Sequence, residues 1–161
     1  MSGELTTTTV RAARPEEAAA VADAVRALLE ELGATPPARD AMEAAARAVI
    51  ADPELGTVLV ALAPDGDALV GVLAASWPAA IHAGGAYGLI QDLWVAPGRR
   101  SDGVGSELVE AYLSLAAARP GVARVEVGIP RDGFPALRQT RRFYQRSGFE
   151  TVGARMRRRT A

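Results

Sequence analysis

Apolar residues recur along the chain at two spacings, and the change between them separates the expected helices from the expected strands. Between residues 18 and 32 they recur as on one face of a helix, until Gly33 ends the run. The preceding Arg14-Pro15-Glu16-Glu17 is typical of a helix start. The same spacing predicts further helices over residues 42–50, 104–119 and 137–146.

Shorter apolar runs, alternating or rich in β-branched residues, predict strands. They cover residues 6–13, 57–63, 68–76, 87–95, 122–129 and 149–158. The turn sequence Pro64-Asp65-Gly66-Asp67 predicts that the second and third strands form a hairpin, and residues 77–86 and 130–135 are expected to be loops. The order β-α-α-β-β-β-α-β-α-β predicts one α/β (α+β) domain over residues 1–161, with a mixed, mostly antiparallel central sheet and helices on both faces.

The residue types that the chain lacks exclude several kinds of chemistry. There is no cysteine, which excludes disulfides, thiolate nucleophiles and cysteine-metal sites. There is also no lysine, which excludes lysine Schiff bases and a Walker-type lysine. A single histidine, His82, cannot form a multi-histidine metal site, so no metal is expected. No apolar run approaches the ~20 residues of a membrane span, and the N-terminus does not resemble a secretion signal, which predicts a cytoplasmic protein without a membrane partner.

Charge is unevenly distributed, although the net charge is −1. Residues 1–60 carry ten acidic residues and five arginines, whereas residues 131–161 carry nine arginines and two acidic residues. A basic end can bind nucleic acid, but the chain has few aromatic residues and no recognised nucleic-acid motif. We therefore interpret these arginines as partners of phosphate groups on a small ligand or as a solvated face, and expect no nucleic-acid partner.

Residues 89–108, LIQDLWVAPGRRSDGVGSEL, join a strand to a helix through a glycine-containing turn. Backbone amides at a helix N-terminus are unpaired and the helix dipole favours an anion there, so this arrangement is a common phosphate-binding site. Neither the dinucleotide-binding pattern G-x-G-x-x-G nor a Walker loop is present. The turn predicts a different kind of phosphorylated ligand.

Two motifs identify that ligand through a resemblance. Val95, Pro97, Arg100, Gly103, Gly105 and Leu108 match the pattern V-x-P-x-x-R-x-x-G-x-G-x-x-L in register. About forty residues on, Phe143-Tyr144 and Gly148-Phe149 match F-Y-x-x-x-G-F. Both motifs, and the order of the expected elements, resemble the GNAT superfamily of acyl-CoA-dependent N-acyltransferases over nearly the whole chain.

The resemblance implies where acetyl-CoA binds. Backbone groups of Leu93 and Val95 would hold the pantetheine arm like an added strand, and the amides of residues 100–106 would cradle the pyrophosphate. Asp102 stands where relatives often carry a basic or neutral residue, and Leu137 where they often carry an asparagine, which Arg138 or Gln139 could replace. The implied cofactor-binding residues are Leu93, Trp94, Val95, Arg99, Arg100, Ser101, Asp102, Gly103, Val104, Gly105, Ser106, Arg138 and Tyr144.

The same resemblance implies that Tyr144 is the general acid that protonates the departing thiolate. The general base is left open. Strict alternation along the strand would place Leu89, Gln91, Leu93 and Val95 on one face and Ile90, Asp92 and Trp94 on the other. Gln91 can orient an amine or a water, Asp92 is a base if a bulge turns it inward, Glu126 is a second candidate, and a water chain without a single base is a further alternative.

The acceptor is expected to be the primary amine of a small molecule or an amino-acid-like compound. Trp77, His82 and Tyr87 are candidates for its binding pocket. The acidic first third of the chain favours a cationic acceptor such as a polyamine or an aminoglycoside, and surface solubility explains it equally well. Alternative functions are transfer from another acyl-CoA in a biosynthetic step, or a CoA-binding regulatory or self-protection module. A monomer or a homodimer is expected.

Overall fold

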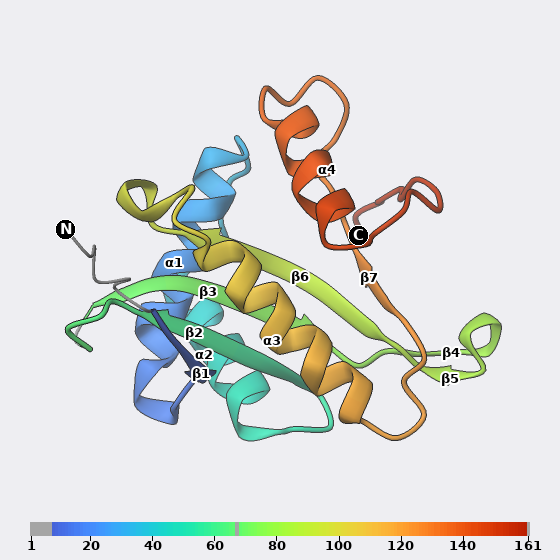
Figure 1. The fold of residues 1–161 in the computed structure, drawn as a ribbon, viewed down its shortest axis with the longest axis horizontal. Helices are drawn as coiled ribbons and strands as arrows, with labels where there is room; N and C mark the ends of the chain where they lie inside the picture. Colours follow the sequence, from blue (N-terminus) through green and yellow to red (C-terminus); the bar gives the residue numbers. More distant parts are fainter. Residues whose placement is uncertain (1–7, 67, 161) are drawn as a thin grey trace, which may run out of the picture.

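The computed structural model describes residues 8–66 and 68–160, whose centre is a five-stranded sheet (Figure 1). Its strands are β1 (Thr9–Ala12), β2 (Gly56–Leu62), β3 (Leu69–Ser76), β6 (Gly88–Val95) and β7 (Val125–Val127). They lie in the order β1-β2-β3-β6-β7, and only the β6–β7 pair is parallel. The mixed, mostly antiparallel sheet predicted from the sequence is therefore confirmed.

Helices cover both faces of this sheet. The 3-10 turn η1 (Pro15–Glu17) leads into α1 (Ala18–Glu31), and α1 and α2 (Arg39–Ala51) lie behind the sheet in the view of Figure 1. The helix α3 (Val104–Ala118) crosses in front of it, and α4 (Leu137–Arg146) lies beside β7 at the edge. The 3-10 turn η3 (Pro97–Arg99) connects β6 to α3.

Alternate residues of the central strands fill two separate cores. Val58, Val60 and Val72 pack toward α1 and α2, whereas Leu59 and Leu73 pack toward α3. Both faces of β2 and β3 are buried, which explains why these strands are continuous apolar runs rather than alternating ones.

The last two strands of the sheet separate soon after they meet. Pairing between β6 and β7 covers only Gly88–Ile90 opposite Val125–Val127. Beyond this point β6 continues to Val95 with its partner β3 on one side only. The splayed strands leave an open edge on β6, directly before the turn into α3.

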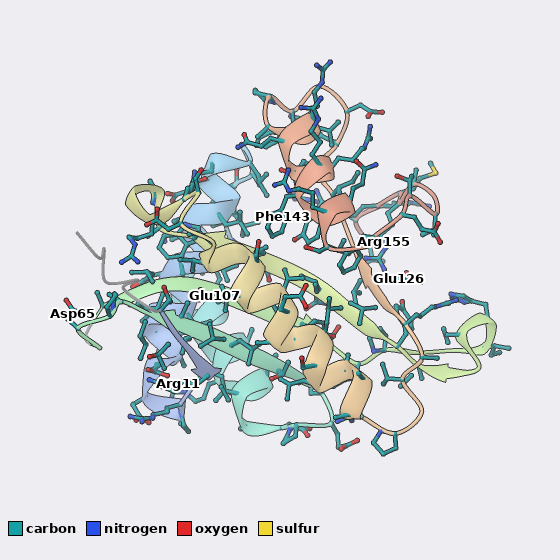
Figure 2. The ribbon with its side chains drawn as sticks, viewed as in Figure 1. Arg11, Asp65, Glu107, Glu126, Phe143 and Arg155 are labelled. Atoms are coloured by element: carbon teal, nitrogen blue, oxygen red, sulfur yellow. The ribbon has the colours of Figure 1, made fainter. Side chains whose placement is uncertain are left out.

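Several predicted boundaries differ from the structure. Residues 149–158 form no strand in the described part of the chain, and Val152 and Met156 are exposed. This run contains Gly153 and three arginines, and Arg155 lies on the exposed loop in Figure 2. With so few apolar residues to bury, pairing with an edge strand of three residues would bring little stabilisation.

Smaller differences concern the ends of elements. The first strand covers Thr9–Ala12, and Thr6 and Thr7 of the prediction lie outside the described residues. The expected loop over residues 77–86 contains a short hairpin of β4 (Ala79–Ala80) and β5 (Gly85–Ala86) around the turn η2 (Ile81–Ala83). None of the helices in the described ranges is long and apolar enough to cross a membrane.

Candidate functional site

A groove of about 590 Å³ opens where β6 and β7 diverge. Its walls come from the end of α1, the open edge of β6, the start of α3, the segment after β7, and α4. The following groups line it: Leu28, Glu31 and Leu32; Ile90, Gln91, Leu93, Trp94 and Val95; Arg99, Arg100, Ser101 and Gly103–Ser106; Val127–Pro130, Phe134, Ala136, Gln139, Thr140, Phe143, Tyr144 and Arg146. Most of the predicted donor-side residues therefore meet in one place.

The turn before α3 has the backbone geometry of an anion cradle. Ser101 and Gly103 both have positive φ, at 70° and 87°, and Gly103 is the N-cap residue. The first backbone bond of the helix is donated by the Glu107 amide to the Gly103 carbonyl. The amides of residues 104–106 consequently precede the helical ladder, and the positive end of the helix dipole lies among them.

The start of α3 also packs closely against α4. A Cβ atom at Gly105 would lie 3.4 Å from the Phe143 ring. Figure 2 shows Phe143 on the side of α4 that faces the sheet. The glycine of the first motif and the phenylalanine of the second are thus in contact, and the two motifs form one structural unit.

Both arginines of the turn are paired with carboxylates. The Arg99 Nε donates to Asp102 at 3.0 Å. One terminal nitrogen of Arg100 lies 2.7 and 2.8 Å from the two carboxylate oxygens of Glu31, and its Nε donates to the Val95 carbonyl at 3.0 Å. Asp102, one of the cofactor-binding residues that the resemblance implies, is exposed and does not line the groove, and its carboxylate accepts a hydrogen bond from Arg99.

The open edge of β6 presents the backbone groups expected to hold pantetheine. The Ala96 amide donates to the carbonyl of Val70, the second residue of β3. Backbone groups alternate in direction along an antiparallel strand, so those of Leu93 and Val95 point away from β3 toward the groove. The bond from Arg100 to the Val95 carbonyl agrees with this direction.

A bulge interrupts β6 at Gln91. Asp92 is opposite Ala74 and Ile90 is opposite Ala75, so Gln91 has no partner of its own on β3. Ile90 consequently packs toward α3 together with Leu93, and the strict alternation predicted from the sequence is wrong at this point. Gln91 is exposed and lines the groove.

Tyr144 lines the groove and is 6% exposed. Its ring centroid is 5.0 Å from that of Phe143 and 5.4 Å from that of Phe149, both in edge-on geometry. Burial raises the pKa of the Tyr144 phenol far above its ordinary value, and the charge of Asp92 raises it further. The hydroxyl therefore carries its proton at neutral pH.

Asp92 is the acidic group whose charge acts on Tyr144. It shares a sheet face with Ala74 and Trp94, on the side of α1, and no ion pair or side-chain hydrogen bond is found for it in the described part of the chain. Burial raises the pKa of its carboxyl above the ordinary value. A carboxylate with a raised pKa is a better proton acceptor than an exposed one.

The other candidate base, Glu126, is differently placed. It lies on β7 (Figure 2), opposite Leu89, and its Oε1 is 3.3 Å from Arg124 Nε. Glu126 does not line the groove. Of the three predicted base candidates, only Gln91 is among the groove-lining residues of the described chain. Asp92 lies next to it on β6, and its charge raises the pKa of Tyr144, whereas Glu126 neither lines the groove nor affects Tyr144.

The predicted acceptor-side residues lie apart from the groove. Trp77 stacks on Tyr112 of α3 at 5.3 Å, with the Arg119 guanidinium 4.9 Å from its ring centroid. His82 is exposed in η2, and its ring is 6.3 Å from that of the buried Tyr87. These three residues therefore belong to the opposite end of the sheet and its short hairpin.

Sequence reasoning missed the groove residues on α1 and after β7. Leu28 and Leu32 follow the same helical spacing as core residues, so their spacing carries no sign of a ligand site. Glu31 is one of ten acidic residues in the first sixty, and nothing in its sequence context distinguishes it from the others. Of the two residues that could replace the asparagine expected at Leu137, Gln139 lines the groove and Arg138 does not.

Comparisons with known proteins agree with this geometry. A model of the acetyltransferase (GNAT) family matches residues 22–149. A search of curated proteins finds no match. Among solved structures, an aminoglycoside acetyltransferase, HMB0005, from an uncultured soil metagenomic sample is similar with a TM-score of 0.74, 22% identity, and coverage of 96% of this chain and 99% of that chain.

Two further structures show the same fold. One is the ribosomal-protein-alanine N-acetyltransferase of Brucella melitensis biovar Abortus 2308, with a TM-score of 0.72, 17% identity, and coverage of 96% of this chain and 100% of that chain. The other is the aminoglycoside N-acetyltransferase AAC(6')-Iy in complex with CoA, with a TM-score of 0.76, 16% identity and coverage of 99% of each chain. At these identities the likeness shows the fold alone.

Proposed function

The chain belongs to the GNAT family of acetyltransferases and is an acyl-CoA-dependent N-acyltransferase; we propose that it transfers the acetyl group of acetyl-CoA to the primary amine of a small-molecule or amino-acid-like acceptor. The observation that carries the proposal is the meeting, in one groove, of the positive-φ turn before α3, the open edge of β6 and the buried Tyr144. These three features suit an anion, an amide-containing arm and a sulfur atom, respectively. They follow one another along the groove as these parts do along acyl-CoA.

The residues present fit the donor. The amides of residues 104–106 would bind the pyrophosphate, and the outward backbone groups of Leu93 and Val95 would pair with the pantetheine amides. The Val95 carbonyl now accepts a hydrogen bond from Arg100, so Arg100 must release it when the pantetheine amide takes its place. The released guanidinium would then lie beside the pyrophosphate.

Acyl transfer moves one proton from the amine and one to the sulfur. The amine nitrogen forms a bond to the carbonyl carbon of the thioester, and the carbon–sulfur bond breaks with its electron pair on sulfur. We assign proton removal from the amine to Asp92, directly or through one water, and donation to the departing sulfur to Tyr144. The Leu93 amide points into the groove, where it would stabilise the negative charge on the carbonyl oxygen.

In this assignment the protonation states of Asp92 and Tyr144 are coupled. While Asp92 is ionised, its charge raises the pKa of Tyr144 and keeps the phenol protonated. When Asp92 takes up the proton of the amine, its charge disappears and the phenol becomes a stronger acid. This change coincides with the departure of the thiolate, which is the moment at which a proton donor is needed.

The experiment is a thiol-release assay with acetyl-CoA and a panel of primary amines. We expect amine-dependent release of CoA by the wild-type chain, and a decrease of about 10²–10⁴-fold in kcat for Tyr144→Phe with little change in acetyl-CoA affinity. Tyr87→Phe is the matched control, because Tyr87 is buried but does not line the groove. Equal turnover by the two variants would contradict the role of Tyr144.

The same panel separates the proposal from its alternatives. Release with propionyl-CoA or a longer acyl-CoA, but not with acetyl-CoA, would favour a biosynthetic acyl transfer. Saturable acetyl-CoA binding without release for any amine would favour the regulatory or self-protection module.

A further inference from the structure

The arginines of the chain form two groups with different surroundings. Of the nine between residues 11 and 124, eight are in ion pairs with carboxylates, at 2.6–3.3 Å. For the nine between residues 131 and 159, no ion pair or side-chain hydrogen bond is found in the described part of the chain, and all nine are exposed. They are Arg131, Arg138, Arg141, Arg142, Arg146, Arg155, Arg157, Arg158 and Arg159. The positive charge of this part of the chain is therefore uncompensated.

Four of these arginines form a stripe along α4. Arg138, Arg142 and Arg146 follow one another at intervals of four residues, and Arg141 comes three residues after the first, so the four share one side of the helix. Like charges at these spacings repel one another and destabilise a helix. Because the stripe costs the fold stability, it favours a role in contacts with another molecule.

The segment after α4 carries four more of the unpaired arginines. Its start is fixed to α4, because the Phe149 amide donates to the Tyr144 carbonyl at 3.0 Å and the two rings are 5.4 Å apart. Figure 1 shows α4 and this segment at one edge of the molecule, near β7. We call the exposed side of α4 together with residues 149–160 the arginine surface. It holds eight arginines and one acidic residue, Glu150.

The groove assigned to acyl-CoA does not account for the arginine surface. Of its eight arginines, only Arg146 lines the groove. The two arginines of the turn before α3, Arg99 and Arg100, belong to the paired group. The other seven arginines of the surface lie outside the groove walls, so a donor bound in the groove leaves them without a partner.

The side chains around these arginines indicate which kind of anion fits. Val152 and Met156 are the only large apolar side chains exposed on the arginine surface, and the aromatic rings of α4 pack against the core. A protein partner normally contacts an apolar centre with aromatic anchors, and single-stranded bases stack on exposed aromatic rings. A helix that lies in a membrane surface inserts its apolar face, which in α4 is already buried. The phosphate backbone of a duplex needs only cations.

From this distribution of charge we infer that the arginine surface binds the phosphate backbone of a double-stranded nucleic acid without reading its sequence. Guanidinium groups suit this contact, because each can donate two hydrogen bonds to one phosphate. The sequence-based expectation of no nucleic-acid partner rests on the few aromatic residues and the lack of a recognised motif. Both concern recognition of bases, whereas contacts with phosphates require neither. This binding is independent of the proposed acetyl transfer.

The test measures fluorescence anisotropy of a labelled DNA duplex, and of an RNA duplex of the same sequence, titrated with the full chain at several salt concentrations. We expect saturable binding of at least one duplex, with a dissociation constant of about 10⁻⁴–10⁻⁶ M near physiological salt and a logarithmic salt slope of about −0.9 per phosphate contacted. Absence of saturable binding of both duplexes at low salt would overturn the inference.

Variants with matched charge test the location. Arg141→Gln/Arg142→Gln changes the stripe on α4, and Arg157→Gln/Arg158→Gln changes the segment after it. Arg26→Gln/Arg47→Gln is the control, because it removes the same charge from arginines that are already paired with Glu30 and Glu43. We expect each surface variant to weaken duplex binding at least about fivefold and to reduce the salt slope by about two, with the control unchanged. Equal losses in all three variants, with unchanged melting temperatures, would show an effect of net charge alone and overturn the assignment of this surface.

Three competitors separate the duplex from other anions. Polyglutamate and phosphatidylglycerol vesicles, at equal concentrations of negative charge, are expected to bind more weakly than the duplex. Equal or stronger binding of polyglutamate would assign the arginine surface to an acidic protein, and that of the vesicles to a membrane, and either result would overturn the inference. Complete displacement of the duplex by one equivalent of acetyl-CoA would overturn it as well, since the arginines would then serve the donor.

Discussion

Arg100, in the turn after β6, and Glu31, at the end of α1, form an ion pair across the groove. They are 69 residues apart in sequence, and one Arg100 nitrogen contacts both Glu31 oxygens. The same guanidinium also bonds the Val95 carbonyl through Nε. Arg100 thus connects the end of α1, the open edge of β6 and the turn before α3, and the proposed donor-binding mode requires it to release the Val95 carbonyl.

This relationship predicts opposite effects for its two partners. Arg100→Gln removes a cation beside the pyrophosphate, so we expect the acetyl-CoA dissociation constant to rise about tenfold, as for the loss of one charge-assisted hydrogen bond of about 1.5 kcal/mol. Glu31→Gln removes the carboxylate that competes for this cation, so affinity is expected to stay equal or improve. Isothermal titration calorimetry measures both constants.

The exposed pair Arg47 and Glu43 on α2 supplies the control, because it does not line the groove. Glu43→Gln should leave acetyl-CoA binding unchanged. If Glu31→Gln weakened binding as much as Arg100→Gln, the pair would be a fixed structural support and the proposed exchange of Arg100 partners would be incorrect.

Asp92 is predicted to lower stability while supporting turnover. Because burial raises the pKa of its carboxyl in the folded chain above the unfolded value, ionisation disfavours the fold as pH rises through the folded pKa. Asp92→Asn is therefore expected to raise the melting temperature by a few degrees at pH 7. The difference should vanish below the unfolded pKa of about 3.9, where the aspartate is neutral in both states.

The same variant should decrease kcat/KM by about 10²-fold or more, since asparagine cannot accept the amine proton. The acid limb of the wild-type pH–rate profile should rise as Asp92 ionises, with an apparent pKa above that of an ordinary aspartate. Melting curves and initial rates over pH 4–9 test both statements. A variant that is less stable at pH 7 and retains full turnover would show that Asp92 is neither strained by burial nor the base.

Gly88 is predicted to be required at the point where β6, β7 and α3 meet. An added Cβ would lie 2.5 Å from the Tyr112 hydroxyl oxygen and 3.0 Å from a Val125 methyl carbon. Because Tyr112 is fully buried and stacked on Trp77, it has little room to move. We expect Gly88→Ala to lower the free energy of unfolding by about 1–3 kcal/mol in urea denaturation.

Two variants make this prediction specific. Tyr112→Phe removes the oxygen that the new methyl group meets, so the double variant should be less destabilised than the sum of the single changes. Gly98→Ala adds a methyl group with no atom within 4 Å and should be neutral. Additive effects of Gly88→Ala and Tyr112→Phe would contradict the predicted contact.

The parts of the fold that the sequence predicts well are those in which local pattern and packing agree. The hairpin of β2 and β3 and the helix α3 follow directly from turn residues, glycines and apolar spacing. The bulge at Gln91 could not be predicted in this way. Residues on both faces of β6 are largely apolar, so a one-residue shift leaves no trace in the pattern.

The candidate site likewise has one part that the sequence predicts and one part that it does not. Its phosphate turn is encoded within a few consecutive residues, from Arg99 to Ser106, and a motif is sufficient to find it. The rest of its wall combines Leu32, Trp94 and Phe134 from three distant segments, and only the folded chain shows that these apolar residues line a groove. Over residues 149–158 the sequence predicts a strand that the structure does not contain, because a weak local strand pattern is not sufficient without a pairing partner in the sheet.

Binding of acyl-CoA along the open edge of β6 and the start of α3 can be measured by titrating the ¹⁵N-labelled chain with acetyl-CoA and following its backbone amide resonances. We expect saturable shifts at Leu93, Val95 and Gly103–Ser106, with the amides of the β4–β5 hairpin unchanged. Absence of saturable shifts up to millimolar acetyl-CoA, or shifts centred on the hairpin, would contradict it.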